Sequence, residues 1–377
     1  MMTVSPDAHP PQAWIETSIG AFENNLRNVM NRLSDGTELC AVVKADAYGA
    51  GAAAMMPSIL RANVPCVGVA DNQEAQVVRS AGFRGRLMRL RTATAAEIVG
   101  AMGYDLEEMV GNIETARLIN AISISCASEI PVHLNLNSAG MSREGMEIST
   151  DCGRRAVLDM VAHPHLRIVG IMSHFADVER QHILHSLEIF RRDTDWIFQN
   201  TTIRREAVLL HIANSLATLR VPTCHFDMVR TGAALYGCVG ARPPFRHVLA
   251  FKSRISSVGE YPAGGTIGYG RTASLARWSR LATIPVGYAN GYRQSFGNNA
   301  AVLVQGQRAP VIGRVSMNSI VADVTDIVDA RSGDEVVLFG RQGDAEIGQA
   351  EVEALAGVVL SDLFSGWGKS NARVTAP

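Results

Sequence analysis

The stretch LCAVVKA (39–45) is a short apolar run with two β-branched valines, and it ends at a lysine followed by the glycine-containing segment DAYGAG (46–51). Apolar runs of roughly four to eight residues with β-branched side chains indicate buried strands. Seven similar runs follow along the chain: PCVGVAD (65–71), GRLMRLR (85–91), LEEMVGN (106–112), PVHLNLN (131–137), LRIVGIMSHF (166–175), VLLHIAN (208–214) and FDMVRTG (226–232).

Segments of helical character separate these runs, for example NQEAQVVRSAG (72–82) and HSLEIFRRDTDWIFQN (185–200). A strand and a helix that alternate eight times are typical of a (β/α)8 barrel, the TIM barrel. The strands should be parallel, because each return to the same edge of the sheet needs a crossover helix. We expect this barrel over residues 12–240.

The pattern changes after residue 241. Short strand-like runs with glycine-containing turns follow, such as RISSVGEYPAG (254–264), LATIPVGYANGY (281–292) and DEVVLFGRQG (334–343). They predict a C-terminal, mostly antiparallel β domain over residues 241–377. The N-terminal segment near 13–18 is a candidate first strand of that domain.

Composition excludes several classes of protein. The 377 residues carry 35 Lys and Arg against 36 Asp and Glu, a net charge of −1, which gives no basic surface for nucleic acid. No apolar run approaches the roughly 18 residues of a membrane span. The start, MMTVSPDAHPPQAW, does not have the pattern of a signal peptide, so we expect a cytoplasmic protein, or a periplasmic one if a signal peptide was removed.

Six cysteines are present, and none forms a CxxC pair, so we expect no metal site. The cysteines are either all reduced thiols or include one disulfide.

Polar side chains end several of the strand runs: Lys44, Asn135, Asn137, His174, Asn214 and Arg230. Barrel enzymes carry their chemistry at the C-terminal ends of the strands, so these residues should meet at one mouth of the barrel. A lysine at the buried end of a strand is uncommon, because burying an ammonium group is costly. Desolvation lowers the pKa of such a lysine, and the neutral amine can then form a Schiff base.

The segment AVVKADAYGAG (41–51) resembles the cofactor-lysine motif of the alanine racemase superfamily of pyridoxal-phosphate enzymes. The similarity continues, in the order of the family and over essentially the whole chain, through SHFAD (173–177), HIANSLATL (211–219), DMVRTGAALYG (227–237), TIGYGRT (266–272), IPVGYANGY (284–292) and GRVSMNS (313–319). This resemblance implies racemisation of free amino acids with pyridoxal 5'-phosphate.

By the same resemblance, Lys44 carries the cofactor covalently. Arg230 would face the ring nitrogen, with His211 behind it. The other residues implied to bind the cofactor are Tyr48, Arg143, His174, Asn214, Ser215, Gly232 and Ala233.

Racemisation needs a proton-transfer group on each face of the substrate Cα. The resemblance assigns these roles to Lys44 and Tyr269, with Tyr269 supplied by the other subunit of a homodimer that shares its active sites. The residues implied to contact the substrate are Arg143, Tyr288, Met317 and Asn318.

The chain departs from typical alanine racemases, which have a lysine in place of Asn135, aspartates in place of Asn290 and Asn318, and a tyrosine in place of Trp367. These departures resemble the broad-specificity amino-acid racemases, which accept lysine and arginine as well as alanine and are typically periplasmic. For this chain the resemblance also implies a disulfide between Cys40 and Cys66, and it allows a chloride ion near Asn135 and Arg143.

Two related activities remain open. One is a strict alanine racemase that supplies D-alanine for peptidoglycan. The other is a fold-type III amino-acid decarboxylase, which needs a catalytic cysteine in the β domain, and no cysteine follows Cys238.

Overall fold

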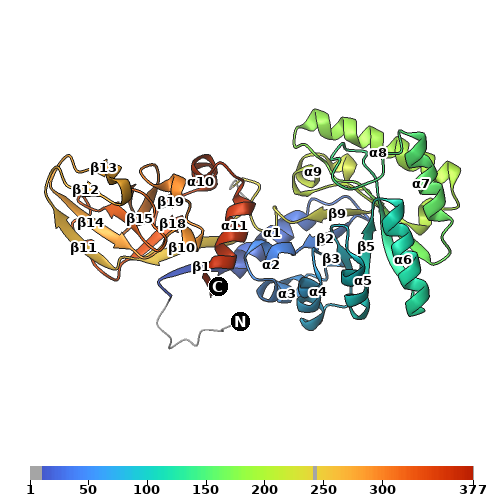
Figure 1. Cartoon of the computed structure of the whole chain (residues 1–377), viewed down its shortest axis with the longest axis horizontal. Helices are drawn as coiled ribbons and strands as arrows, with labels where there is room; N and C mark the ends of the chain where they lie inside the picture. Colours follow the sequence, from blue (N-terminus) through green and yellow to red (C-terminus); the bar gives the residue numbers. More distant parts are fainter. Residues whose placement is uncertain (1–10, 241–243, 377) are drawn as a thin grey trace. The chain divides into compact units, whose positions relative to one another are not determined.

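The computed structural model describes residues 11–240 and 244–376 (Figure 1). The chain packs as two compact units. The barrel unit comprises residues 23–47 and 52–235, and the β unit comprises the described residues up to 22, the segment 48–51 and the described residues from 236 onward.

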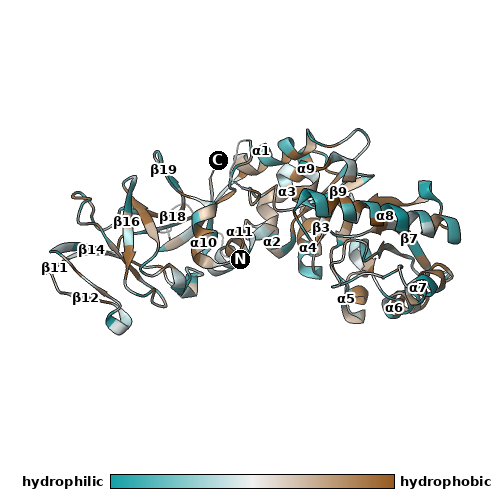
Figure 2. Ribbon diagram, turned by 90° about the horizontal axis from the view of Figure 1, so that it is seen from above, coloured by the Kyte–Doolittle hydropathy of each residue, from teal (hydrophilic) through white to brown (hydrophobic). Residues whose placement is uncertain are grey.

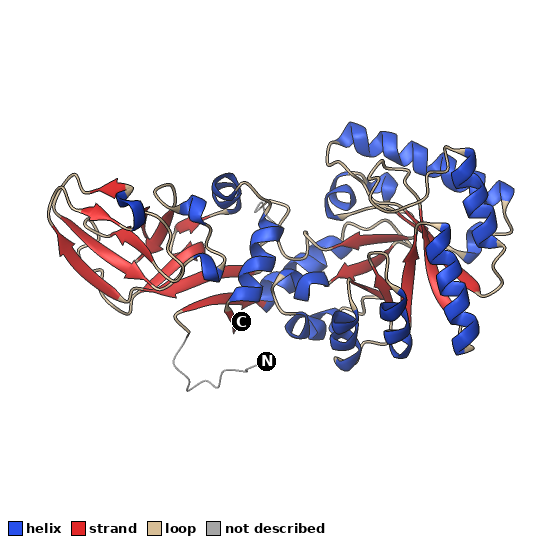
Figure 3. Ribbon diagram, in the orientation of Figure 1, coloured by secondary structure: helices blue, strands red, loops and turns tan. Residues whose placement is uncertain are grey.

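The barrel unit is built on eight parallel strands in the order β8-β7-β6-β5-β4-β3-β2-β9 (Figure 3). Backbone hydrogen bonds from Asp227 N–H to Leu210 O (3.1 Å) and from Arg230 N–H to Ala213 O (3.0 Å) join the chain around β9 and β8, so the sheet closes on itself. The strands are β2 (Glu38–Val42), β3 (Cys66–Val69), β4 (Arg86–Arg89), β5 (Leu106–Val110), β6 (Ile130–Asn135), β7 (Leu166–Met172), β8 (Leu209–His211) and β9 (Met228–Thr231). The predicted barrel is confirmed.

Helices connect successive strands, and side chains cap several of their first turns. Thr94 and Glu97 form a reciprocal capping box at the start of α5, and Asn112 accepts a hydrogen bond from the Thr115 amide at the start of α6. The helices are α1 (Ile19–Met30), α2 (Lys44–Tyr48), α3 (Ala52–Arg61), α4 (Asn72–Ser80), α5 (Ala95–Gly100), α6 (Ile113–Cys126), α7 (Asp151–Val161), α8 (Arg180–Asn200) and α9 (Ser215–Arg220).

Helix α8 shows why these segments fold onto the barrel. Its buried positions, among them Ile183, Leu187, Phe190 and Ile197, recur every three or four residues and therefore form one face. The remaining face is largely hydrophilic (Figure 2).

Sulfur-containing side chains dominate one buried cluster of the barrel. It consists of Cys40, Cys66, Met88, Met109, Met172 and Met228, with Leu90 packed against it. Methionine is unbranched and polarisable, so it can fill the irregular space left beside polar neighbours inside a barrel.

The β unit contains a mostly antiparallel sheet in the order β11-β14-β17-β16-β15-β18-β10-β1-β20, and β19 pairs with β18. The N-terminal strand β1 (Ala13–Ser18) pairs antiparallel with β10 and parallel with β20. The other strands are β10 (Leu249–Arg254), β11 (Ser257–Tyr261), β12 (Thr266–Ile267), β13 (Ala273–Ser274), β14 (Ser279–Ile284), β15 (Ala301–Val304), β16 (Gln307–Ile312), β17 (Ile320–Asp323), β18 (Glu335–Gln342), β19 (Ala345–Ile347) and β20 (Ala372–Ala376).

Two helices complete the β unit, α10 (Gln349–Ala356) and α11 (Leu360–Ser370). Trp367 of α11 packs against Phe251 and Phe339 of the sheet, with ring centroids 5.2 and 5.4 Å apart. Within residues 11–240 and 244–376, no helix combines the length and apolarity that crossing a membrane requires. The same residues contain no cluster of three or more His, Cys, Asp or Glu side chains suited to a metal ion.

Candidate active site

Lys44 follows β2 directly and begins a left-handed turn. Residues 45–48 have φ angles of 55, 52, 56 and 55°. Such a backbone costs a non-glycine residue about 1–2 kcal/mol, and strain of this kind concentrates at functional sites. Hydrogen bonds hold the turn, since Glu74 accepts from the Asp46 amide (3.2 Å) and Asp46 accepts from the Ala52 amide (2.7 Å). The turn therefore fixes the point where Lys44 leaves the strand.

Charged side chains of both signs act on Lys44, with Glu74 and Glu144 opposing two arginines. Desolvation, followed by the charges of Arg143 and Arg230, lowers the pKa of Lys44, although solvent reaches its side chain. Desolvation, followed by the charges of Arg230, Lys44 and Arg143, lowers the pKa of His174 to about 3, so this imidazole is neutral near pH 7. All four side chains lie at or beyond the C-terminal ends of barrel strands, since Lys44 follows β2, Arg143 follows β6, His174 follows β7 and Arg230 lies near the end of β9.

Arg230 on β9 is the most constrained of these side chains. Its Nη2 donates to Ser173 O (2.7 Å) and lies 3.3 Å from His174 Nδ1, while its Nη1 donates to His211 O (3.0 Å) and to His211 Nδ1. Burial lowers the pKa of Arg230 to about 10, which leaves the guanidinium charged at neutral pH. The predicted support of Arg230 by His211 is present in these contacts.

Ser215 and the chain after β9 also come together as expected. The Ser215 hydroxyl oxygen accepts hydrogen bonds from the amides of Gly232 and Ala234, each at 3.1 Å. Ala233 lies between these two residues. The Asn214 side chain caps α9 by accepting from the Ala217 amide at 3.0 Å, so a contact between its oxygen and a cofactor stays a prediction.

The exposed Arg143 lies on a loop that Asn137 organises. The Asn137 side chain accepts from the Ser142 amide (2.8 Å) and donates to Glu147 (2.9 Å). Asn135, two residues earlier on β6, is buried. The sequence placed Asn137 at a strand end but did not predict that it would order the Arg143 loop.

Tyr48 belongs to the β unit. Its ring stacks on Tyr236 with centroids 4.7 Å apart, and burial raises the pKa of Tyr48. These contacts hold the ring in one place.

The β unit also presents Tyr269, whose side chain is 74% exposed. Gly268 and Gly270 flank it with φ angles of 68 and 73°, values that glycine adopts without strain. Tyr288 and Met317 are exposed large side chains of the same unit, and their loops are joined by the hydrogen bonds Tyr288 N–H to Ser316 O and Ala289 N–H to Met317 O, each 3.0 Å.

Three of the departures from typical alanine racemases also lie in the β unit. The Trp367 side chain is 1% exposed and donates to Gly291 O (3.1 Å). Asn371 donates to the backbone oxygens of both Asn290 and Trp367, each at 2.9 Å, so two of the departures form one network. Asn318 is exposed. The roles of Trp367 and Asn318 at a substrate pocket stay predictions.

Cys40 and Cys66 lie directly opposite each other on β2 and β3. Both are fully buried, and the structure contains them as free thiols. A hydrogen bond with Cys40, together with burial, raises the pKa of Cys66. The predicted proximity is present, whereas the disulfide is not formed in this structure.

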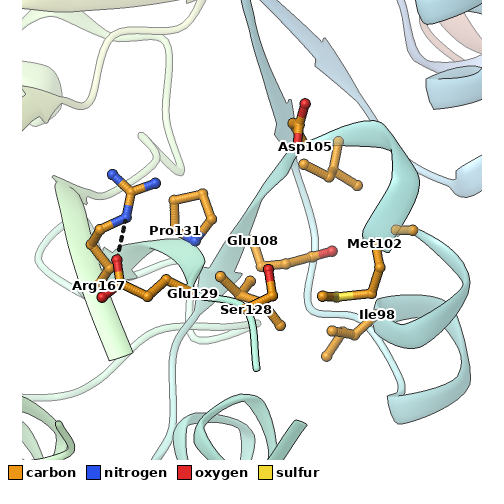
Figure 4. Close-up of a pocket in the computed structure, with 11 residues that line it drawn as sticks. Ile98, Met102, Asp105, Glu108, Ser128, Glu129, Pro131 and Arg167 are labelled. Atoms are coloured by element: carbon orange, nitrogen blue, oxygen red, sulfur yellow. Dashed lines mark ion pairs between the residues drawn. The ribbon is translucent and has the colours of Figure 1, made fainter. Parts of the chain in front are cut away.

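A cavity of about 250 Å³ lies at the opposite end of the barrel (Figure 4). Leu106, Ile130, Pro131 and Arg167 of its lining come from the first residues of β5, β6 and β7. Barrel chemistry occurs at the other, C-terminal ends of the strands, so this cavity is not the candidate active site.

Sequence reasoning missed two buried polar residues inside the barrel. His133 Nδ1 lies 2.8 Å from His211 Nε2, and His133 Nε2 lies 2.8 Å from Glu107 Oε2. Strand alternation could have identified His133, because it shares a face of β6 with Asn135, two residues away.

The comparisons with known proteins agree with this geometry. Models of the alanine racemase N-terminal and C-terminal domains match residues 17–239 and 248–375. The chain is 47% identical to a broad specificity amino-acid racemase of Pseudomonas taetrolens and 41% identical to a lysine racemase of Proteus mirabilis, in each case over 96% of this chain and 89% of the relative.

Among solved structures, the alanine racemase of Streptomyces coelicolor A3(2) superposes with a TM-score of 0.88 at 29% identity, covering 97% of this chain and 98% of that one. Two family models that together span nearly the whole chain, and relatives this similar in sequence, leave one assignment: the chain belongs to the alanine racemase family and is an amino-acid racemase.

Proposed function

We propose that this enzyme racemises a broad range of free amino acids, including lysine, arginine and alanine, with pyridoxal 5'-phosphate bound at Lys44. The observation that carries the proposal is the placement of Lys44, Arg143, His174 and Arg230 at the C-terminal ends of barrel strands, with Arg230 Nη2 3.3 Å from His174 Nδ1. The broad range is supported by the activities named for the relatives from Pseudomonas taetrolens and Proteus mirabilis.

The donor set fits this cofactor. The lowered pKa of Lys44 increases the fraction of neutral amine that can bond to an aldehyde. The concentration of cationic groups favours an anion such as phosphate, which the Ser215 hydroxyl and the amides of Gly232 and Ala233 would hold, together with Tyr48. His174 and Asn214 would contact the rest of the cofactor. When bound, pyridoxal phosphate supplies an electron-withdrawing ring that acidifies the α-proton of an attached amino acid.

The side chains of this enzyme then control where protons go. Arg230 can only donate, so it would leave a facing ring nitrogen without a proton. Tyr269 would remove the α-proton of an L-amino acid, and Lys44 would return a proton to the opposite face. For a D-amino acid the two residues exchange roles.

We further propose a homodimer in which Tyr269, Tyr288 and Met317 complete the active site of the second subunit. All three side chains are exposed within their own unit, as residues that contact a second copy would be. Gel filtration with light scattering tests this, since an active monomer would contradict it.

Three finer features belong to the same proposal. An anion such as chloride would sit near Asn135 and Arg143, where the neutral amide cannot balance the charge of the arginine. The paired positions of Cys40 and Cys66 support a disulfide under oxidising conditions, and with it a periplasmic location.

The decisive experiment is chiral chromatography of the purified enzyme incubated separately with L-alanine, L-lysine and L-arginine. Comparable racemisation of lysine or arginine supports the broad range. Racemisation of alanine alone would indicate a strict alanine racemase. Formation of the amine that remains when the amino acid loses its carboxylate would indicate a decarboxylase.

A further inference from the structure

Four buried side chains form one continuous chain of hydrogen bonds across the barrel interior. Arg230 Nη1 contacts His211 Nδ1, His211 Nε2 lies 2.8 Å from His133 Nδ1, and His133 Nε2 lies 2.8 Å from Glu107 Oε2. The residues come from β9, β8, β6 and β5, and none is more than 9% exposed. We call these four residues the relay.

The chemistry of arginine fixes the direction of every bond in the relay. A guanidinium only donates, so His211 Nδ1 must accept. A neutral imidazole has one donor nitrogen and one acceptor nitrogen, so the proton of His211 lies on Nε2 and is donated to His133 Nδ1. His133 then carries its own proton on Nε2 and donates it to the Glu107 carboxylate. With neutral imidazoles, this is the single arrangement in which every hydrogen bond of the relay has one donor and one acceptor.

The arrangement also depends on the far end of the relay, because the last proton needs an acceptor. Without an acceptor at Glu107, the proton on His133 Nε2 has no buried partner, which weakens the preference for this tautomer that Arg230 sets from the other end. If its proton moved to Nδ1, it would face the donor Nε2 of His211. A shift of His211 to its other tautomer would in turn set a donor against Arg230. Two buried donors that face each other are costly, so the guanidinium would have to turn away.

We propose that Glu107 and His133 are positioning residues, which fix the tautomer of His211 and thereby hold Arg230 in the orientation that the cofactor ring requires. The predicted effect on turnover rests on the proposed function, whereas the relay itself is supported by the hydrogen bonds described above. Hydrogen bonds in such a chain polarise one another, so the effect should extend from Glu107 to Arg230.

The first test is ¹⁵N NMR of the imidazole nitrogens in the holoenzyme, with His133 and His211 assigned from His133→Asn and His211→Asn variants. We expect both residues to be neutral with the proton on Nε2. An imidazolium, or a proton on Nδ1 of either residue, overturns the relay. This measurement does not depend on activity.

The second test compares Glu107→Leu, which removes the acceptor, with Glu107→Gln, whose amide oxygen can still accept from His133. Glu107→Leu should lower kcat about tenfold with KM within twofold of the wild type, and mix the tautomers of His133. Glu107→Gln should restore the Nε2 proton and most of kcat. The control is Glu38→Gln, a carboxylate at the start of β2 that pairs with Arg86 and should leave kcat unchanged.

The outcomes separate the two proposals. If Glu107→Leu folds, keeps its tautomers and turns over like the wild type, Glu107 is no positioning residue. If Glu107→Leu does not fold, the wild-type spectrum and the Glu107→Gln spectrum still decide. A wild-type enzyme that racemises nothing, yet shows both Nε2 protons, would contradict the proposed function and leave the relay in place.

Discussion

Replacing Tyr269 with phenylalanine should separate catalysis from stability. The side chain is 74% exposed within its own unit, so loss of one hydroxyl group should change the unfolding free energy by less than about 0.5 kcal/mol. Loss of a positioned proton-transfer group, in contrast, slows a reaction by about 10²–10⁴, which corresponds to about 2.7–5.4 kcal/mol of activation free energy. The two effects differ by several-fold in free energy, so one set of measurements distinguishes them.

The assay combines racemisation rates, urea unfolding and exchange of the α-hydrogen in D₂O. Lys44 remains in the variant, so a D-amino acid should still exchange its α-hydrogen for deuterium without inversion. The L-amino acid should exchange at a rate lowered by the same 10²–10⁴. Proton NMR of the α-position and chiral chromatography report both quantities.

The matched control is Tyr261→Phe, at a tyrosine of the β unit that is 48% exposed and has no proposed role in catalysis. It should match the wild type in every assay. The two-residue mechanism is refuted if Tyr269→Phe racemises at the wild-type rate, or if both enantiomers exchange equally fast in that variant. A large loss of stability would refute the structural basis of the estimate.

Three further predictions concern single side chains. Lys44→Ala should lose the visible absorbance of the bound cofactor while its far-ultraviolet circular dichroism stays unchanged. Trp367→Phe should lower the unfolding free energy by about 1–3 kcal/mol, measured by urea, because it removes the bond to Gly291 and shrinks a buried ring. The pKa of His174 is about 3 in the folded state against an ordinary 6.5, so only the unfolded chain gains this proton as the pH falls from 6.5 towards 3. Wild-type stability should therefore fall with decreasing pH by about 1.4 kcal/mol per unit more than that of His174→Gln, which urea titrations at pH 7 and pH 5 would show.

Strand–helix alternation predicted the barrel because the hydrophobic effect acts on short segments. Most of the strand runs are mainly apolar, as strands buried on both faces require, and polar residues or glycines mark the loops between them. The same rule located Lys44, His174 and Arg230 at one end of the barrel, since parallel strands end together. Some of the predicted strands were longer than the strands in the structure. VLLHIAN (208–214) contains a strand only at Leu209–His211, and its last residue caps the following helix.

The left-handed turn after Lys44 lay beyond prediction. The sequence ADAY (45–48) contains alanines that favour a right-handed helix, and none of its residues is a glycine. Contacts with Glu74 and Ala52, which are not adjacent in sequence, override this preference. Local propensity is worth less than about 1 kcal/mol per residue, so a few tertiary hydrogen bonds can reverse it.

The relay could not be predicted from the sequence for a different reason. Barrel interiors are usually filled by branched apolar side chains, and a polar residue in a strand run is normally assigned to the outer end. Glu107 and His133 are 26 residues apart, and His133 and His211 are 78 residues apart, so only the three-dimensional pairing reveals their contacts. Once the contacts are known, however, Arg230 at one end and the Glu107 carboxylate at the other together determine both tautomers. A residue that only donates and a carboxylate that only accepts thus fix the same chain of bonds from opposite ends, which is why a carboxylate remote from Lys44 should influence turnover.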